Sequence, residues 1–201
     1  MRRLSDVALL VAVASLLAGC SSDSSSSSSP DVTVPVVAVD AVLIQLGSYE
    51  VGGVPDEFVL GPVIVVYGDG SVHAELYVGV ENGEASLRLV TGQLSESHLR
   101  DVFDAAASLP APGVVGEQAT DGAPMLLRVG SQEWAINDVS VQPYRQFMDD
   151  LIALVDEEVT QPWVPEQWIV KPFGEPCKVV AENPQAGPYD APVYPHLQAP
   201  C

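Results

Sequence analysis

The stretch Val63-Ile-Val-Val-Tyr67, followed by Gly68-Asp-Gly-Ser71 and then by Val72 to Val78, decides the fold of this chain. Two apolar runs on either side of an Asp-Gly turn are the strongest local signal for a β-hairpin. In the second run, Val72, Ala74, Leu76 and Val78 alternate with His73, Glu75 and Tyr77, which predicts a half-buried antiparallel strand. The first run has no such alternation, and this is typical of a strand that is covered on both faces.

The flanking sequence predicts further strands. We expect one over Ala41–Tyr49, which Gly52-Gly53 ends, and one over Ala85–Val90. Met125–Val129 and Glu133–Val139 predict a second hairpin, because the short polar segment between them suits a turn.

Two segments carry apolar residues at helical spacing. Ser95 is a suitable N-cap for a helix over Glu96–Leu109, which Pro110 ends. Pro143 suits the first turn of a second helix, whose apolar stripe comprises Tyr144, Phe147, Met148, Leu151, Ile152 and Val155. The sequence therefore predicts an α+β domain over residues 40–160, with an antiparallel sheet built from two hairpins plus extra strands and two amphipathic helices on one face.

Residues 161–201 form a tail rich in proline and aromatic residues, with nine prolines before Cys201. We expect such a tail to make no sheet of its own. It is either laid across the domain in extended form or mobile, and its aromatic residues favour the first arrangement.

The N-terminus predicts a targeting signal over residues 1–19. Arg2 and Arg3 precede the apolar run Val7–Ala18, which is too short to span a bilayer as a helix but suits a secretory signal. Leu17-Ala-Gly-Cys20 resembles the lipobox of bacterial lipoproteins. This resemblance implies that Cys20 is lipidated and becomes the first mature residue, followed by a serine-rich linker to residue 39. We therefore expect lipid anchoring at the extracytoplasmic face of the cell membrane.

The two remaining cysteines, Cys177 and Cys201, are expected to form a disulfide, since an exported protein meets an oxidising compartment. Free thiols are the first alternative. A nucleophilic Cys177 acting with His196 is the second, and no local motif supports it.

The folded part resembles exported proteins and lipoproteins of actinobacteria. The resemblance rests on Gly52-Gly53, the stretch from Pro62 to Gly70, the segment from Leu94 to Ala106 and Thr120-Asp121. It implies no activity, and no catalytic residue is carried over from that group.

Composition and motifs exclude several classes of function. Asp and Glu number 27 against 8 Lys and Arg, a formal net charge of −19, which argues against nucleic-acid binding. We expect no cofactor and no metal, because the familiar phosphate-binding, zinc and hydrolase motifs are absent from the sequence. Gly68-Asp-Gly70 suits a turn better than a calcium loop. His73 is expected to be solvated, and so is His98 in the first helical turn.

The leading hypothesis is a non-enzymatic binding module that is anchored in the cell envelope and recognises an envelope protein or wall component. A first alternative is a small-ligand or wall-carbohydrate binder that uses Trp163 and Trp168, although these indoles more often cover a protein's own surface. A second alternative is an enzyme of unrecognised, carboxylate-dependent type, whose mark would be a paired-carboxylate cleft.

Overall fold

A computed structural model describes residues 37–47, 50–51, 59–60, 63–81, 84–117, 124–170, 176–181, 191–199 and 201. The chain divides into two compact units, residues 1–31 and 32–201, and every described residue belongs to the second. The expected signal, Cys20 and the serine-rich linker up to residue 36 lie outside the described residues, as do Gly52-Gly53 and Thr120-Asp121.

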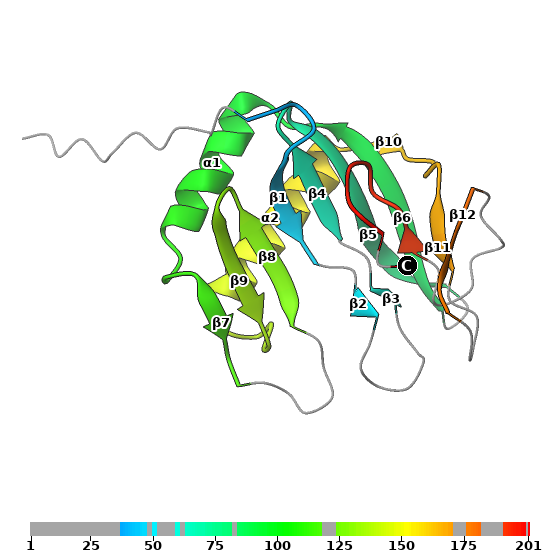
Figure 1. The fold of residues 1–201 in the computed structure, drawn as a ribbon. Helices are drawn as coiled ribbons and strands as arrows, with labels where there is room; N and C mark the ends of the chain where they lie inside the picture. Colours follow the sequence, from blue (N-terminus) through cyan, green and yellow to red (C-terminus); the bar gives the residue numbers. More distant parts are fainter. Residues whose placement is uncertain are drawn as a thin grey trace, which may run out of the picture. The chain divides into compact units, whose positions relative to one another are not determined.

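The main element is an eight-stranded mixed sheet with the strand order β10-β6-β5-β4-β1-β8-β9-β7 (Figure 1). In chain order its strands are β1 Val42–Leu46, β4 Ile64–Tyr67, β5 Ser71–Glu81, β6 Glu84–Gln93, β7 Gly113–Val115, β8 Met125–Val129, β9 Gln132–Ile136 and β10 Gln161–Pro162. The two expected hairpins are β4–β5 and β8–β9, both antiparallel, and β1 joins them by pairing with β4 and β8.

The expectation of a purely antiparallel sheet was wrong at one edge, where β7 pairs in parallel with β9. The strand β7 has three residues and follows Pro110 and Pro112 rather than a tight turn. No hairpin therefore sets its direction, and its sequence is too short to show a period.

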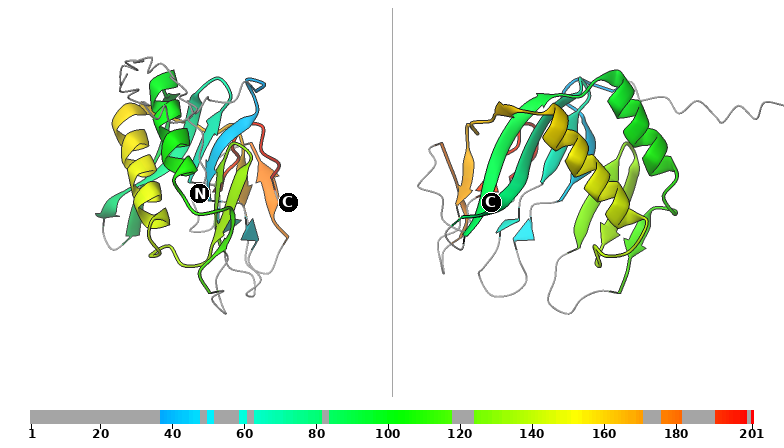
Figure 2. Two further views of the ribbon diagram at one scale, coloured as in Figure 1. Left: turned by 90° about the vertical axis from the view of Figure 1, so that its left-hand side faces the viewer. Right: turned by 180° about the vertical axis from the view of Figure 1, so that it is seen from behind.

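Helices α1 (Glu96–Ala107) and α2 (Tyr144–Glu158) lie side by side on one face of the sheet (Figure 2). Ser95 caps α1 as expected, its Oγ accepting from the backbone N–H of His98 at 3.2 Å. The apolar stripes of both helices pack in one core with Ile64, Val66, Val72 and Ala74, each 0% exposed. Neither described helix combines the length and the hydropathy of a bilayer-spanning segment.

Part of the proline-rich tail forms a three-stranded antiparallel sheet, which corrects the expectation that it forms none. The strands are β11 Trp168–Val170, β12 Lys178–Val180 and β13 Ala191–Pro192, with β11 in the middle. They escape sequence analysis because they are two or three residues long, and Pro192 is tolerated because β13 is an edge strand. Earlier in the tail, Pro162 lies in β10, the edge strand paired with β6. A separate two-stranded sheet contains β2 Glu50–Val51 and β3 Val59–Leu60.

Candidate functional site

A C-terminal segment crosses the face of β4 that points away from the helices. We call this segment the strap, and it comprises residues 191–199 and 201. Val193 N–H donates to the carbonyl of Gln167 at 2.9 Å, which extends the pairing of β13 with β11. Tyr194 is fully buried in one cluster with Val65 and Tyr67 of β4. The strap therefore supplies the second cover that the unbroken apolar run in β4 requires.

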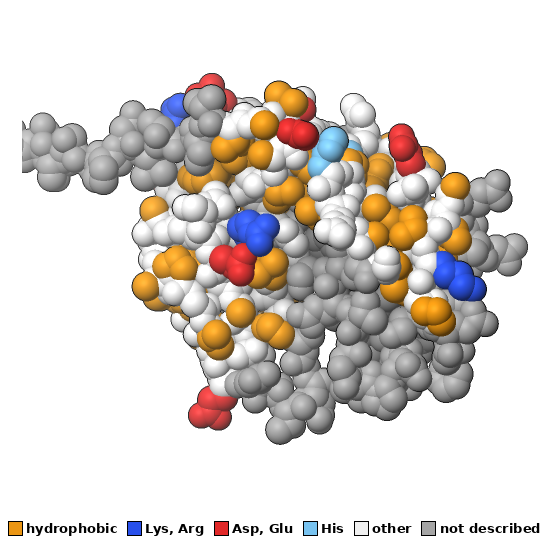
Figure 3. Space-filling view, viewed as in Figure 1, with side chains coloured by type: hydrophobic (Ala, Val, Ile, Leu, Met, Phe, Trp, Pro, Cys, Tyr) orange, Lys and Arg blue, Asp and Glu red, His pale blue; other side chains and the backbone are white. Residues whose placement is uncertain are grey.

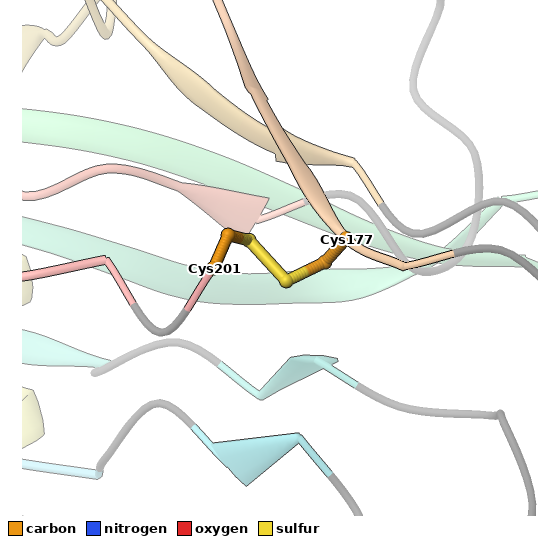
Figure 4. The surroundings of a disulfide bond; sticks show 2 residues. All are labelled: Cys177 and Cys201. Carbon is orange, nitrogen blue, oxygen red and sulfur yellow. A yellow bond between two sulfur atoms is a disulfide. The ribbon is translucent and has the colours of Figure 1, made fainter.

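Two further bonds hold the strap. The hydroxyl of Tyr67 donates to the carbonyl of Pro195 at 2.5 Å. Cys177, just before β12, forms a disulfide with Cys201 at a Cα–Cα distance of 5.4 Å (Figure 4). The cysteine pair expected from the sequence thus links the end of the strap to the three-stranded sheet, which we call the small sheet.

Aromatic rings from three parts of the chain meet beneath the strap. The imidazole of His73 in β5 stacks on the indole of Trp163, with centroids 4.8 Å apart and planes at 22°. Trp163 also contacts Tyr194 at 4.9 Å, and Tyr67 meets His73 edge to face at 5.8 Å. His196, at an exposed turn of the strap, contacts Tyr67 at 5.7 Å. The pair of Trp163 and Tyr194 contributes about 0.5–1.5 kcal/mol beyond its buried area, so it helps to hold the rings in place.

The position of His73 corrects the expectation of a solvated strand residue. Tyr77, farther along the same face of β5, is 63% exposed, but His73 is half-buried under Trp163. Burial lowers the pKa of His73 to about 4, because the imidazolium would lose its hydration. Its Nδ1 is buried and has no hydrogen-bond partner among the described residues. At neutral pH, His73 is therefore an uncharged ring with a polar atom available under the strap.

Two hollows adjoin at His73, Pro195 and His196, and together we call them the strap site. The first, of about 460 Å³, lies over the β4–β5 turn and is also lined by Asp40, Asp69 and Ser71. The second, of about 580 Å³, lies toward the small sheet and is also lined by Trp163, Glu166, Gln167 and Tyr194, among others. Volumes of this order accommodate small ligands.

The β4–β5 turn fixes the two carboxylates of the first hollow. Gly70 has φ +82° and closes the turn by donating to the carbonyl of Tyr67 at 2.9 Å. A Cβ on Gly68 would lie 2.1 Å from the carbonyl oxygen of Ala38, so glycine lets residues 37–40 pack on the turn and brings Asp40 to the hollow. Hydrogen bonds from Ser71, including one from its backbone N–H at 2.8 Å, lower the pKa of Asp69 and keep it ionised.

The charge of the strap site is negative. Its described lining contains Asp40, Asp69 and Glu166 but no lysine or arginine. On the face drawn in Figure 3, acidic and hydrophobic side chains lie near the histidine, with basic side chains farther away. Within the described ranges, no group of three or more His, Cys, Asp or Glu is arranged to hold a metal ion. The turn at Gly68-Asp-Gly70 is held by its own hydrogen bonds.

The structure brings Trp163, His73, His196 and the disulfide-bonded tail together, although they were separate features of the sequence. Trp168 lies apart from this ring cluster: it is half-exposed, begins β11 and pairs with Val180 and Pro192. His98 is half-buried in the first turn of α1. The contribution of Tyr67 was missed, and its only signal was a polar hydroxyl at the end of an otherwise apolar strand.

No protein-family model, no curated protein and no solved structure matches this chain.

The depressed pKa of His73 predicts a pH-dependent stability. Below pH 6.5, the unfolded chain binds a proton on this residue that the folded chain does not bind until about pH 4. The unfolded state is thereby favoured as the pH falls through this window. We expect the melting temperature of the protein to fall from pH 6.5 to 4, and to fall less steeply in His73→Phe, which keeps a ring against Trp163. Thermal melts followed by circular dichroism measure this difference.

The comparison isolates His73 because the other groups are common to both proteins. Burial raises the pKa of Glu75, on the same face of β5, and this acts in the opposite direction. Parallel pH profiles for wild type and His73→Phe would contradict the burial of His73 under the strap.

Proposed function

We propose that this chain is a lipid-anchored, non-enzymatic binding module of the bacterial cell envelope, and that the strap site binds an uncharged, hydroxyl-rich wall glycan. The observation that carries the proposal is the pair of hollows that adjoin at His73, Pro195 and His196. They place hydrogen-bonding groups beside aromatic rings in a setting that is held by a disulfide.

Charge limits the class of ligand. Asp69 is ionised, His73 is uncharged at neutral pH, and the described lining contains no lysine or arginine. A phosphorylated or carboxylated ligand would meet the like charge of the carboxylates and find no lysine or arginine to pair with. An uncharged ligand with many hydroxyls meets no such repulsion.

The polar groups of the site suit hydroxyls. A carboxylate only accepts hydrogen bonds, whereas an amide such as that of Gln167 both donates and accepts, and a sugar hydroxyl can do either. Trp163 already has one ring face against His73, so it is not the open stacking platform that an exposed tryptophan would provide. We infer that hydrogen bonds supply most of the recognition and that Trp163 fixes the wall of the site.

The proposed anchor agrees with an envelope location. A diacylated Cys20 would hold the chain at the membrane, and the serine-rich segment Ser21–Pro30 would lift the folded unit by up to about 30 Å when extended. This reach, rather than a spanning helix, would bring the strap site to wall polymers.

The anchor is tested with Cys20→Ser in the native host. Because lipidation needs the thiol, we expect the variant to be released or to remain unprocessed, measured by membrane fractionation and by the mass of the mature chain. The double variant Cys177→Ser/Cys201→Ser is the matched control and should stay in the membrane fraction. A Cys20→Ser chain that is shortened at residue 20 and still membrane-bound would contradict the proposal.

Glycan binding is tested by titrating the full chain in detergent with soluble oligomers of N-acetylglucosamine and with uncharged wall-derived glycan fragments. We expect a saturable change in tryptophan fluorescence, since Trp163 lines the second hollow. Asp69→Asn keeps the oxygen that accepts from Ser71 but loses the charge. Loss of a charged hydrogen bond of about 1.5–3 kcal/mol predicts at least about tenfold weaker binding.

Asp138→Asn is the matched control, because Asp138 accepts from the backbone N–H of Ser140 at 2.9 Å in a similar turn outside the strap site. Its affinity should stay within about twofold of wild type. An equal loss in both variants, or a folded protein that none of these glycans perturbs, would overturn the proposed ligand class.

Two other functions remain as weaker proposals. A protein component of the envelope is the first alternative partner of the strap site. A carboxylate-dependent enzyme is the other, and its mark would be two carboxyls of divergent pKa in one cleft. Hydrogen bonds lower the pKa of Asp69 and burial raises that of Glu75, but Glu75 is not among the described residues that line the hollow of Asp69.

A further inference from the structure

A third hollow lies in the groove between α1 and α2, on the face of the sheet opposite the strap. Its volume is about 350 Å³, and both helices contribute to its lining. The floor is apolar: Val102, Phe147 and Leu151 are buried in the main core. Leu109 and Leu154 are only partly buried, and Ala105 is exposed. We call this the helix groove, and none of its lining belongs to the strap site.

The rim of the helix groove is acidic. Asp101 of α1 and Asp150 of α2 both line it, and both are exposed. Helices α1 and α2 together carry eight carboxylates against two arginines. Each arginine already pairs within its own helix, Arg100 with Glu96 at 3.0 Å and Arg145 with Asp149 at 3.5 Å. No lysine or arginine is among the described residues of the lining.

Because the floor of the helix groove is apolar and its rim is acidic, the charge of a bound molecule decides which kinds of occupant fit. A second copy of this chain would present the same acidic rim, and its net charge of −19 would add to the repulsion. A fatty acid or an anionic lipid headgroup would place its charge beside Asp101 and Asp150. A helix with apolar residues on one face and lysine or arginine beside them satisfies both the floor and the rim, since helix-in-groove binding uses anchors at i, i+3, i+4 and i+7.

We propose that the helix groove docks a basic amphipathic helix of another envelope protein. The apolar side of that helix lies on Leu109, Leu154 and the floor between them, while its basic residues pair with Asp101 and Asp150. This inference is independent of the glycan proposal, because the two sites share no lining residue. It gives the chain a second partner class, a protein held at the helix face while the strap face is open to the wall.

The test uses a fluorescein-labelled peptide of leucine and lysine, about five helical turns long, with leucine at the four anchor spacings. Its anisotropy is followed as the full chain in detergent is added at low salt. We expect saturable binding, and at least about tenfold weaker binding when glutamate replaces every lysine. A peptide of the same composition with its leucines spread around the helix is the control for the apolar face and should also bind at least about tenfold more weakly.

The location is tested with two double variants that change the net charge equally. Asp101→Asn/Asp150→Asn removes the rim charges, and we expect at least about tenfold weaker binding of the lysine peptide. Asp104→Asn/Glu157→Gln removes two exposed carboxylates on the same helices outside the lining and should change affinity by less than about twofold. Ala105→Phe, at an exposed position, fills the groove and should also weaken binding at least about tenfold.

Three results would overturn the inference. Equal losses in the two double variants would show general charge attraction rather than docking in the groove. Unchanged binding in Ala105→Phe, with wild-type circular dichroism, would place the peptide elsewhere. Displacement of the lysine peptide by a fluorescent fatty acid, whose binding Ala105→Phe abolishes, would assign the groove to an acyl chain instead.

Discussion

The burial of β4 on both faces is the constraint on which the rest of the described unit depends. Ile64 and Val66 face the helices and Val65 faces the strap, and all three are 0% exposed. Burying one such side chain contributes about 1.5–3 kcal/mol, so a bare second face would leave much of the stabilisation of this strand unrealised. The chain meets the requirement with two helices on one face and with a segment of about ten residues on the other.

Holding the strap against β4 has an entropic cost, because ordering each of its residues opposes folding by about 1–2 kcal/mol. The disulfide offsets part of this cost. A sequence separation of 24 between Cys177 and Cys201 corresponds to about 3.5 kcal/mol in the chain-entropy description. The hydrogen bond from Tyr67 to Pro195 and the ring contacts of Trp163 add local attachment. The strap site is a consequence of this attachment, since hollows lie on either side of the strap where it meets the sheet.

The sequence predicted the elements that show a hydrophobic repeat or a local signal such as a helix cap. The alternation in β5, the missing alternation in β4, the Ser95 cap and the stripe on α2 predicted those elements, and the structure has them. The parallel strand β7 and the small sheet could not be predicted, because strands of two or three residues are too short to show a period. Ile152 belongs to the predicted stripe but is 36% exposed, since the stripe is wider than the buried face.

The site was predicted only in fragments. Composition favoured a tail laid across the domain, but nothing local indicated that Trp163 would stack on His73, which lies ninety residues earlier in the chain. Because of that contact, His73 is half-buried and its pKa is lowered, whereas the sequence predicted a solvated side chain. The helix groove was missed because periodicity identifies the apolar side of each helix but not the space left between two of them.

The most direct test of this account is site-resolved NMR of the oxidised protein, with the exchange of the Val193 amide and the contacts between the Tyr194 ring and the Val65 methyl groups measured in one sample. If the strap is the second cover of β4, the Val193 amide is protected by its bond to Gln167, and nuclear Overhauser effects join the Tyr194 ring to Val65. A Val193 amide that exchanges at the rate of an unstructured peptide, together with an absence of contacts between Tyr194 and Val65, would contradict it.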